Sequence, residues 1–134
     1  MCIRDRRHPQ GERVLAAGLG AATTRALSAA GVAVTVLDLD AERGPALAAE
    51  LGGHTTFVRT DVTDAGSVQA AVEEATGKDR PLRIAVNCAG IGYAARLLSR
   101  DGRPHELAAF SRTVSVNLVA VSYTHLTLPT NREV

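Results

Sequence analysis

The sequence contains only two cysteines, Cys2 and Cys88, and a single lysine, Lys78. Two cysteines without metal-ligand spacing predict neither a disulfide framework nor a metal site, which favours a reducing cytoplasm. No apolar run approaches membrane-spanning length, and the basic residues 1–10 lack the apolar core of a secretory signal. A formal net charge of +1 provides no strong field for nucleic acid or an anionic membrane. We therefore expect a cytoplasmic protein whose partner is a small molecule.

The two ends of the chain differ from its middle. Residues 1–5 can be encoded by ATG TGT ATA AGA GAC, and the reverse complement of these codons encodes Val-Ser-Tyr-Thr-His, which is residues 121–125. Inverted copies at both ends of a reading frame are typical of a transposon-based sequencing adapter. We therefore expect residues 1–6 and 121–134 to be adapter-like and non-native, which leaves 7–120 as the native segment. The alternative is a natural basic start and a polar tail.

Short apolar runs alternate with alanine-rich segments through the middle of the chain, whose composition is that of about one globular domain. Strands are predicted at 14–17, 32–37, 55–59 and 82–86, and helices at 21–30, 41–51, from about 63 to 76, and from 105 or 106 to 117. Strands that alternate with helices predict a parallel sheet with helices on both faces. The expected fold is the N-terminal half of a Rossmann-type doubly wound α/β sheet, a three-layer α/β/α arrangement with strand order 3-2-1-4.

Ligands of such sheets bind at the carboxyl ends of the strands. Candidate cofactor-binding residues follow all four predicted strands: Gly18, Leu19 and Gly20; Asp38 and Leu39; Asp61 and Val62; and Asn87, Cys88, Ala89 and Gly90. Their shared position is stronger evidence for a site than any one of these short motifs.

Each group has a functional and a structural interpretation. Glycines before a helix let the backbone approach a pyrophosphate, which the helix N-terminus attracts, although a Gly-x-Gly pair can also be a tight turn. Asp38, on the order of 20 residues past the glycines, can accept hydrogen bonds from a ribose 2′-hydroxyl and would repel a 2′-phosphate. Asp38 therefore favours NAD over NADP, and Asp40 is suited to the alternative role of capping the next helix.

The last two groups are less specific. Asp61 can hold an adenine amino group or help cap the helix that follows, and the sequence leaves both open. Small residues at 87–90 leave room for a flat ligand. Cys88 is predicted to be a packing residue rather than a nucleophile, because no histidine or basic group is placed to activate its thiol.

Together these motifs resemble those of the short-chain dehydrogenase/reductase family. That family carries Thr-Gly-x-x-x-Gly-x-Gly, an acid after strand two, Asp-Val after strand three and Asn-Asn-Ala-Gly after strand four. The resemblance covers about residues 11–120 and includes Val116, Asn117 and Leu118. It implies a nicotinamide cofactor, NAD, a secondary alcohol as substrate, and a parent protein that forms homotetramers.

A narrower resemblance is carried by residues 85–91, the long loop to Gly102 and residues 110–117. These segments are similar to the type-2 3-hydroxyacyl-CoA dehydrogenases, which are NAD-dependent. The similarity implies oxidation of the 3-hydroxyl group of acyl-CoA thioesters.

The sequence also departs from the family pattern. Counting back from Gly20, the first glycine of the loop should stand at Val14 and the threonine at Arg13. The family's chemistry uses a serine and a Tyr-x-x-x-Lys pair, but no lysine follows Lys78. Tyr93 and Tyr123 are followed four residues later by leucine and threonine.

Asn117 is the catalytic position of the family that this sequence retains, and the resemblance implies that its backbone holds a water of the proton relay. A second hypothesis is therefore a catalytically inactive nucleotide-binding fragment. A methyltransferase-like domain shares the glycine-rich loop and the acid after strand two. The motif at residues 87–90 argues against it.

Overall fold

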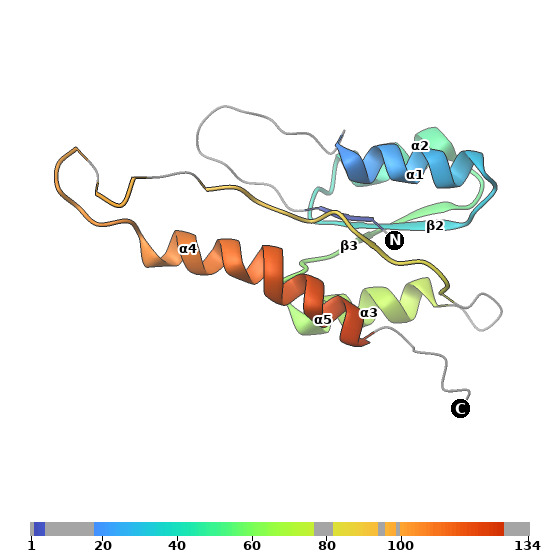
Figure 1. Cartoon of the computed structure of the whole chain (residues 1–134). Helices are drawn as coiled ribbons and strands as arrows, with labels where there is room; N and C mark the ends of the chain where they lie inside the picture. Colours follow the sequence, from blue (N-terminus) through green and yellow to red (C-terminus); the bar gives the residue numbers. More distant parts are fainter. Residues whose placement is uncertain (1, 5–17, 77–81, 94–95, 99, 128–134) are drawn as a thin grey trace.

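The computed structural model describes residues 2–4, 18–76, 82–93, 96–98 and 100–127. Strands and helices alternate along the chain, as the sequence predicts. The elements are β1 (Cys2–Arg4), α1 (Leu19–Ala29), β2 (Val34–Asp38), α2 (Arg43–Leu51), β3 (Thr55–Arg59), α3 (Ala65–Ala75), β4 (Val86–Asn87), α4 (Leu107–Val114), the π-helical turn η1 (Ser115–Val119) and α5 (Ala120–Thr127). Figure 1 shows the sheet between two helical layers, with α1 and α2 on one face and α3, α4 and α5 on the other.

The strands form a parallel sheet in the order β3-β2-β1-β4, which confirms the predicted topology. Its central strand is β1, where Ile3 pairs with Leu37 on one side and Asn87 on the other. We expected residues 1–6 and 121–134 to lie outside the fold, yet Cys2–Arg4 forms β1 and Ala120–Thr127 forms α5. Backbone pairing explains how an unexpected segment can join a sheet, because it depends on no particular side chain. The adapter origin of both ends and the native limits 7–120 stay predictions.

The first strand and the incomplete glycine loop predicted at residues 13–17 lie outside the described residues. The fourth strand is shorter than predicted and ends one residue later, since β4 is Val86–Asn87 and the predicted strand is 82–86. The other two strands match closely: β3 has the predicted limits, and β2 begins two residues later than expected.

The core consists of two apolar clusters, one on each face of the sheet. Val34 and Val36 of β2 pack with residues of α1 and α2, namely Ala21 and Leu47. Leu37 belongs to the opposite cluster, formed with residues of the β3–α3 turn, α3, η1 and α5: Val62, Val68, Ala71, Val72, Val116 and Ala120. Successive side chains of a strand point to opposite faces, so the continuous apolar run of β2 is covered on both sides.

Local signals account for the start of α3 and the end of α2. Asp64 caps α3, because its Oδ1 accepts a 2.6 Å hydrogen bond from the Ser67 N–H. Gly52 follows α2 with a φ of 58°, a conformation that glycine adopts without steric cost. Between the first two helices, Arg25 donates to Glu50 over 2.8 Å, and this hydrogen bond holds the pKa of Glu50 below its ordinary value.

The last helical segment is longer than the helix predicted to end at Asn117. It continues through η1 into α5, and within η1 the Ala120 N–H donates to the Ser115 carbonyl. None of the helices in the described ranges combines the length and the apolar character needed to cross a bilayer.

Candidate functional site

The candidate residues that follow β2, β3 and β4 meet at one edge of the sheet, as predicted. Asp38 ends β2 and is paired with Arg4 of β1. Asn87 ends β4 and is paired with Ile3, the residue before Arg4. The Thr60 N–H donates to the Asp38 carbonyl at 3.0 Å, which extends the ladder toward Asp61. Figure 1 shows the N-terminal end of α1, which Gly18 caps, at this same carboxyl edge.

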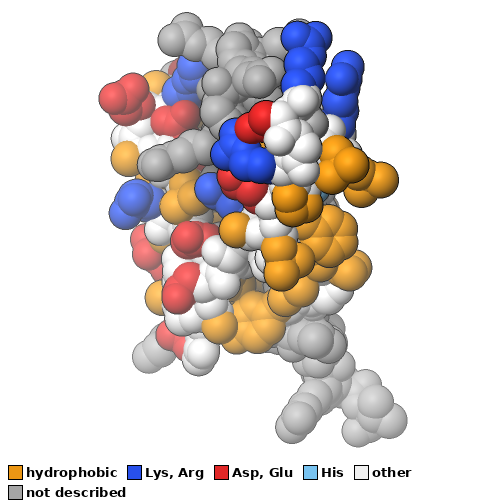
Figure 2. Space-filling model, turned by 90° about the vertical axis from the view of Figure 1, so that its left-hand side faces the viewer, with side chains coloured by type: hydrophobic (Ala, Val, Ile, Leu, Met, Phe, Trp, Pro, Cys, Tyr) orange, Lys and Arg blue, Asp and Glu red, His pale blue; other side chains and the backbone are white. Residues whose placement is uncertain are grey.

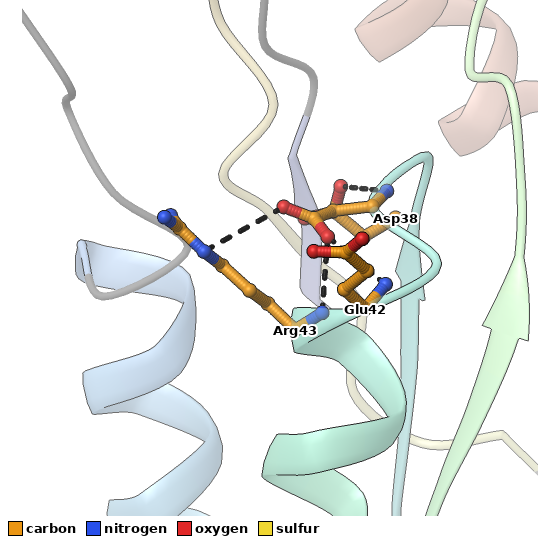
Figure 3. A network of polar contacts seen from close by, with 4 residues as sticks. Asp38, Glu42 and Arg43 are labelled. Carbon is orange, nitrogen blue, oxygen red and sulfur yellow. Dashed lines mark hydrogen bonds and ion pairs between the residues drawn. The ribbon is translucent and has the colours of Figure 1, made fainter.

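Asp38 and Asp40 have separate roles at the turn between β2 and α2. Asp38 is only 7% exposed, and its Oδ1 accepts a 3.0 Å hydrogen bond from the Asp40 N–H. Asp40 caps α2, because its Oδ1 accepts from the N–H groups of Glu42 and Arg43 at 3.1 and 3.0 Å. The capping role predicted for Asp40 is confirmed, and Figure 3 shows this network. Capping α2 therefore does not require the Asp38 side chain.

Two buried nitrogen atoms near this edge lack hydrogen-bond partners within the described part of the chain. They are Nη1 of Arg43, at the start of α2, and Nδ2 of Asn87, at the end of β4. An unpaired buried donor costs free energy that a bound oxygen atom can recover. The edge thus combines a buried carboxylate, which accepts hydrogen bonds from hydroxyl groups, with donors suited to phosphate or ribose oxygens.

Asp61 lies in a tight turn rather than at a helix cap. Its Oδ1 accepts from the backbone N–H and the hydroxyl of Thr63 at 2.8 and 2.6 Å. The cap of α3 is Asp64, and both hydrogen bonds that Asp61 Oδ1 accepts come from Thr63, which precedes the helix. The alternative in which Asp61 helps cap α3 is therefore wrong. Val62 is buried in the core and holds this turn against the sheet.

A cavity of about 620 Å³ opens beside Asp61. Residues after β2 and β3 form one wall, and residues from α4 through α5 form the other: Leu39, Asp61, Val62, Thr63 and Ala65 face Arg112, Ser115, Val119, Ala120 and Tyr123. Sequence reasoning identified part of the first wall and missed the second. The spacing of Arg112, Ser115 and Val119 indicates a common helix face, but spacing alone does not show what that face opposes.

Asn117 ties η1 to the chain segment that follows β4. Its Nδ2 donates to the Ile91 carbonyl at 2.8 Å, and its Oδ1 accepts from the Ile91 N–H at 2.9 Å. The amide therefore satisfies both backbone groups of Ile91, directly after residues 87–90. The structure gives Asn117 a positioning role through its side chain, in addition to the backbone role that the family resemblance implies.

Replacing Asn117 by leucine is expected to lower the free energy of unfolding by about 1–2 kcal/mol, because Ile91 loses two hydrogen bonds while water can reach the exposed site. Urea unfolding followed by circular dichroism measures this change. Asn117→Asp is the matched variant: an aspartate still accepts from the Ile91 N–H but places a charged oxygen against the Ile91 carbonyl, so it should lose stability at neutral pH and recover part of it when the carboxyl group is protonated. Equal stability of Asn117→Leu and the original chain would contradict the positioning role.

The described part of the loop after β4 includes a cysteine and an aromatic pair. Cys88 is half-buried. The Tyr93 ring contacts the His105 ring edge to face, with centroids 5.1 Å apart. Among the described residues, no group of histidine, cysteine, aspartate and glutamate side chains could hold a metal ion.

Hydrophobic side chains gather on the face seen in Figure 2, which views the molecule from the left-hand side of Figure 1. Among the described residues, the large apolar side chains exposed on the loop after β4 and on α4 are Tyr93, Leu97, Leu98, Leu107 and Phe110. They lie outside both core clusters.

Comparison with known proteins agrees with the motifs. The family model described as short chain dehydrogenase matches residues 15–130. The 3-hydroxyacyl-CoA dehydrogenase type-2 of Homo sapiens is 40% identical over 105 residues, which cover 78% of this chain and 40% of that protein. The D-threitol dehydrogenase of Mycolicibacterium smegmatis is 38% identical over 107 residues, covering 77% of this chain and 39% of that protein.

Solved structures show the same relationship. The crystal structure of 3-hydroxyacyl-CoA dehydrogenase type-2 from Mycobacterium avium matches with a TM-score of 0.74 and 39% identity, covering 94% of this chain and 46% of that one. A short-chain dehydrogenase/reductase from Serratia marcescens matches with a TM-score of 0.72 and 26% identity, over 94% of this chain and 48% of its own. The chain thus spans about 40% of the length of the curated relatives that it matches. It belongs to the short-chain dehydrogenase family of oxidoreductases.

Proposed function

We propose that this chain is the nucleotide-binding part of an NAD-dependent oxidoreductase that oxidises a secondary alcohol, the 3-hydroxyl group of a 3-hydroxyacyl-CoA. The observation that carries the cofactor assignment is Asp38, a buried carboxylate at the carboxyl end of β2 whose helix-capping role is taken by Asp40. A carboxylate there accepts hydrogen bonds from ribose hydroxyls and repels a 2′-phosphate.

The neighbouring residues suit the rest of the nucleotide. Asp61 and Val62 border the 620 Å³ cavity, which has room for an adenine base, and Oδ1 of Asp61 is already fixed by Thr63. Residues 18–20 start α1 at the carboxyl edge, where backbone N–H groups and the helix dipole favour a pyrophosphate. Nicotinamide, when bound, supplies the acceptor for a hydride from the alcohol carbon.

The substrate class is supported by the named relatives. Two 3-hydroxyacyl-CoA dehydrogenases, from Homo sapiens and Mycobacterium avium, are 40% and 39% identical to this chain. A D-threitol dehydrogenase at 38% identity supports the broader class of secondary alcohols. We test the substrate by expressing the complete reading frame and following NAD reduction with 3-hydroxybutyryl-CoA and with simple secondary alcohols. Absence of turnover with all of them would refute the assignment.

A second candidate is that the 134-residue chain binds nucleotide without catalysing hydride transfer. It is favoured by the sequence, in which no lysine follows Lys78 and Tyr-x-x-x-Lys is absent. NAD-dependent turnover by the purified chain would rule out this candidate, whereas binding without turnover would support it.

The cofactor proposal makes a direct prediction for Asp38→Asn. We expect the substitution to weaken NAD binding about tenfold, because the amide replaces a charged hydrogen-bond acceptor, and to improve NADP binding by removing a repulsive charge. Calorimetric titration of the 134-residue chain with each dinucleotide measures both changes. Asp101→Asn, the same charge change on an exposed loop residue, is the control and should alter neither affinity. An unchanged NAD affinity in a folded Asp38→Asn variant would contradict the proposal.

A further inference from the structure

The loop after β4 turns back on itself as a short hairpin before α4 begins. The His105 N–H donates to the Leu97 carbonyl at 2.9 Å, and Leu98 forms an antiparallel bridge with Pro104. The described residues of this hairpin are 96–98 and 100–105. Figure 1 shows the hairpin extending past the start of α4, away from the sheet. It therefore projects from the folded part of the chain and is open to contact from outside.

Two neighbouring leucines of the hairpin face solvent. Leu97 is 85% exposed and Leu98 is 61% exposed. The main-chain contacts with His105 and Pro104 hold their backbone, so the hairpin would have to open to bury them. Adjacent apolar side chains on a projecting loop gain free energy when a partner removes them from water. We therefore expect this part of the hairpin to contact an apolar medium.

The positive charge of the chain is concentrated in the same hairpin. Residues 96–105 contain three arginines and one acid, Asp101, which is a formal charge of +2, whereas the whole chain has +1. Arg96 and Arg100 are exposed, as is the ion pair that joins Arg103 to Asp101 over 2.6 Å. The hairpin thus presents cations to solvent beside its exposed leucines.

The surroundings of the hairpin do not reverse this charge. Figure 2 faces this end of the molecule and shows Lys and Arg side chains beside hydrophobic ones. Glu106, the next acid along the chain, is the N-cap residue of α4 and lies at the base of the hairpin. The chain-wide charge, from which we expected no membrane partner, averages over this local excess. Apolar side chains flanked by cations suit the interface of an anionic bilayer, where acyl chains receive the apolar groups and lipid phosphates attract the cations.

We propose that this hairpin binds the surface of a membrane that contains anionic phospholipids, with Leu97 and Leu98 entering the interface and Arg96 and Arg100 next to the lipid phosphates. A free anion would contact the arginines but leave the leucines in water. A protein partner is less suited, because each side of a standard interface uses roughly 20–30 residues and the hairpin offers fewer. The contact is shallow and reversible, since two leucines bury less apolar area than one acyl anchor.

The hairpin is separate from the residues proposed to hold the nucleotide, because none of its residues borders the 620 Å³ cavity. Vesicle binding can therefore be measured without nucleotide or substrate. The test is co-sedimentation of the 134-residue chain with vesicles of phosphatidylcholine and with vesicles of equimolar phosphatidylcholine and phosphatidylglycerol. We expect binding to the mixed vesicles alone, and less of it as added salt screens the arginines.

Two double variants separate the apolar and the charged contributions. Leu97→Ser with Leu98→Ser should weaken binding to the mixed vesicles about tenfold, since the apolar area that enters the lipid is lost. Arg96→Gln with Arg100→Gln should weaken it about fivefold for each arginine and reduce its dependence on salt. The arginine variant keeps both leucines, so it tests the proposal even if the leucine variant does not fold.

Leu118→Ser is the matched control, because Leu118 is 62% exposed on η1, outside the hairpin, and its replacement should leave binding unchanged. Absence of binding to the mixed vesicles would overturn the proposal, as would equal binding to both kinds of vesicle or unchanged binding by the two double variants. Loss of self-association by the leucine variant, seen in sedimentation velocity with no loss of vesicle binding, would also overturn it, because the leucines would then contact a second copy of the chain.

Discussion

Leu37→Ala is expected to lower the free energy of unfolding by about 2–5 kcal/mol, the range observed when a buried leucine is truncated. Leu37 has no exposed surface, and it joins β2 to the core cluster formed by α3, η1 and α5. The truncation removes apolar contacts and leaves a cavity that the paired strands on both sides of β2 cannot close. Urea unfolding monitored by circular dichroism measures the loss.

The matched control for Leu37 is Leu97→Ala, the same truncation at a side chain that is 85% exposed. It should change stability by less than about 0.5 kcal/mol, as is usual for surface positions. Similar losses for the two variants would mean that the cluster around Leu37 does not contribute to stability as the structure indicates. Because small domains have total stabilities of only about 5–15 kcal/mol, Leu37→Ala is also expected to reduce nucleotide binding through partial unfolding.

Gly44→Ala is the second substitution with a large expected effect. A Cβ atom at Gly44 would overlap the Phe57 ring, lying 2.7 Å from Cζ and closer still to Cε2 and Cδ2. Gly44 is buried on α2, which packs against β3, so neither element can move without disturbing the sheet. We expect a loss of about 1–3 kcal/mol, measured as a shift of the urea midpoint, because overpacking outweighs alanine's higher helix propensity.

Two further variants separate crowding from other causes at Gly44. Gly66→Ala, on α3, is the control, since its Cβ would be at an ordinary 3.5 Å from Asp64 Oδ1, and it should stabilise the chain by about 0.5–1 kcal/mol. Phe57→Leu combined with Gly44→Ala should recover part of the lost stability, because the smaller side chain leaves room for the new methyl group. Absence of coupling between positions 44 and 57 would contradict the packing explanation.

Local features of the sequence were sufficient to predict the topology and the sheet edge that holds the candidate site. The run at Thr55–Arg59 is β-branched and bounded by turn residues, and it forms β3 with the predicted limits. The run that forms β2 begins later than expected because Val32 and its neighbour remain on the exposed connection from α1. Asp40 has the capping bonds predicted for it, since side-chain caps depend on residues only two or three positions away.

The features that sequence reasoning missed depend on contacts between distant segments. The pairing of Cys2–Arg4 with both β2 and β4 is set by backbone groups of strands more than thirty residues away, which leave no local signal in a three-residue segment. Arg112 and Ser115 line the cavity beside Asp61 only because α4 and η1 lie across from the turn after β3. Arg43 was likewise not singled out, since the sequence does not show which of its nitrogen atoms is buried.

The π-helical turn at Ser115–Val119 determines where this segment can tolerate a change in length. Val116, Ala120 and Thr124 are buried at intervals of four residues, which is the spacing of one helix face, and the first two belong to the apolar cluster around Leu37. A π-helical turn holds one residue more than an α-helical turn, so removing one residue from it would restore an ordinary α-helix and leave α5 in nearly the same orientation. Removing one residue from the regular helix of α5 would instead rotate the residues after it by about 100° and take Thr124 out of the interior. The two deletions are therefore expected to differ sharply in stability although each removes a single residue.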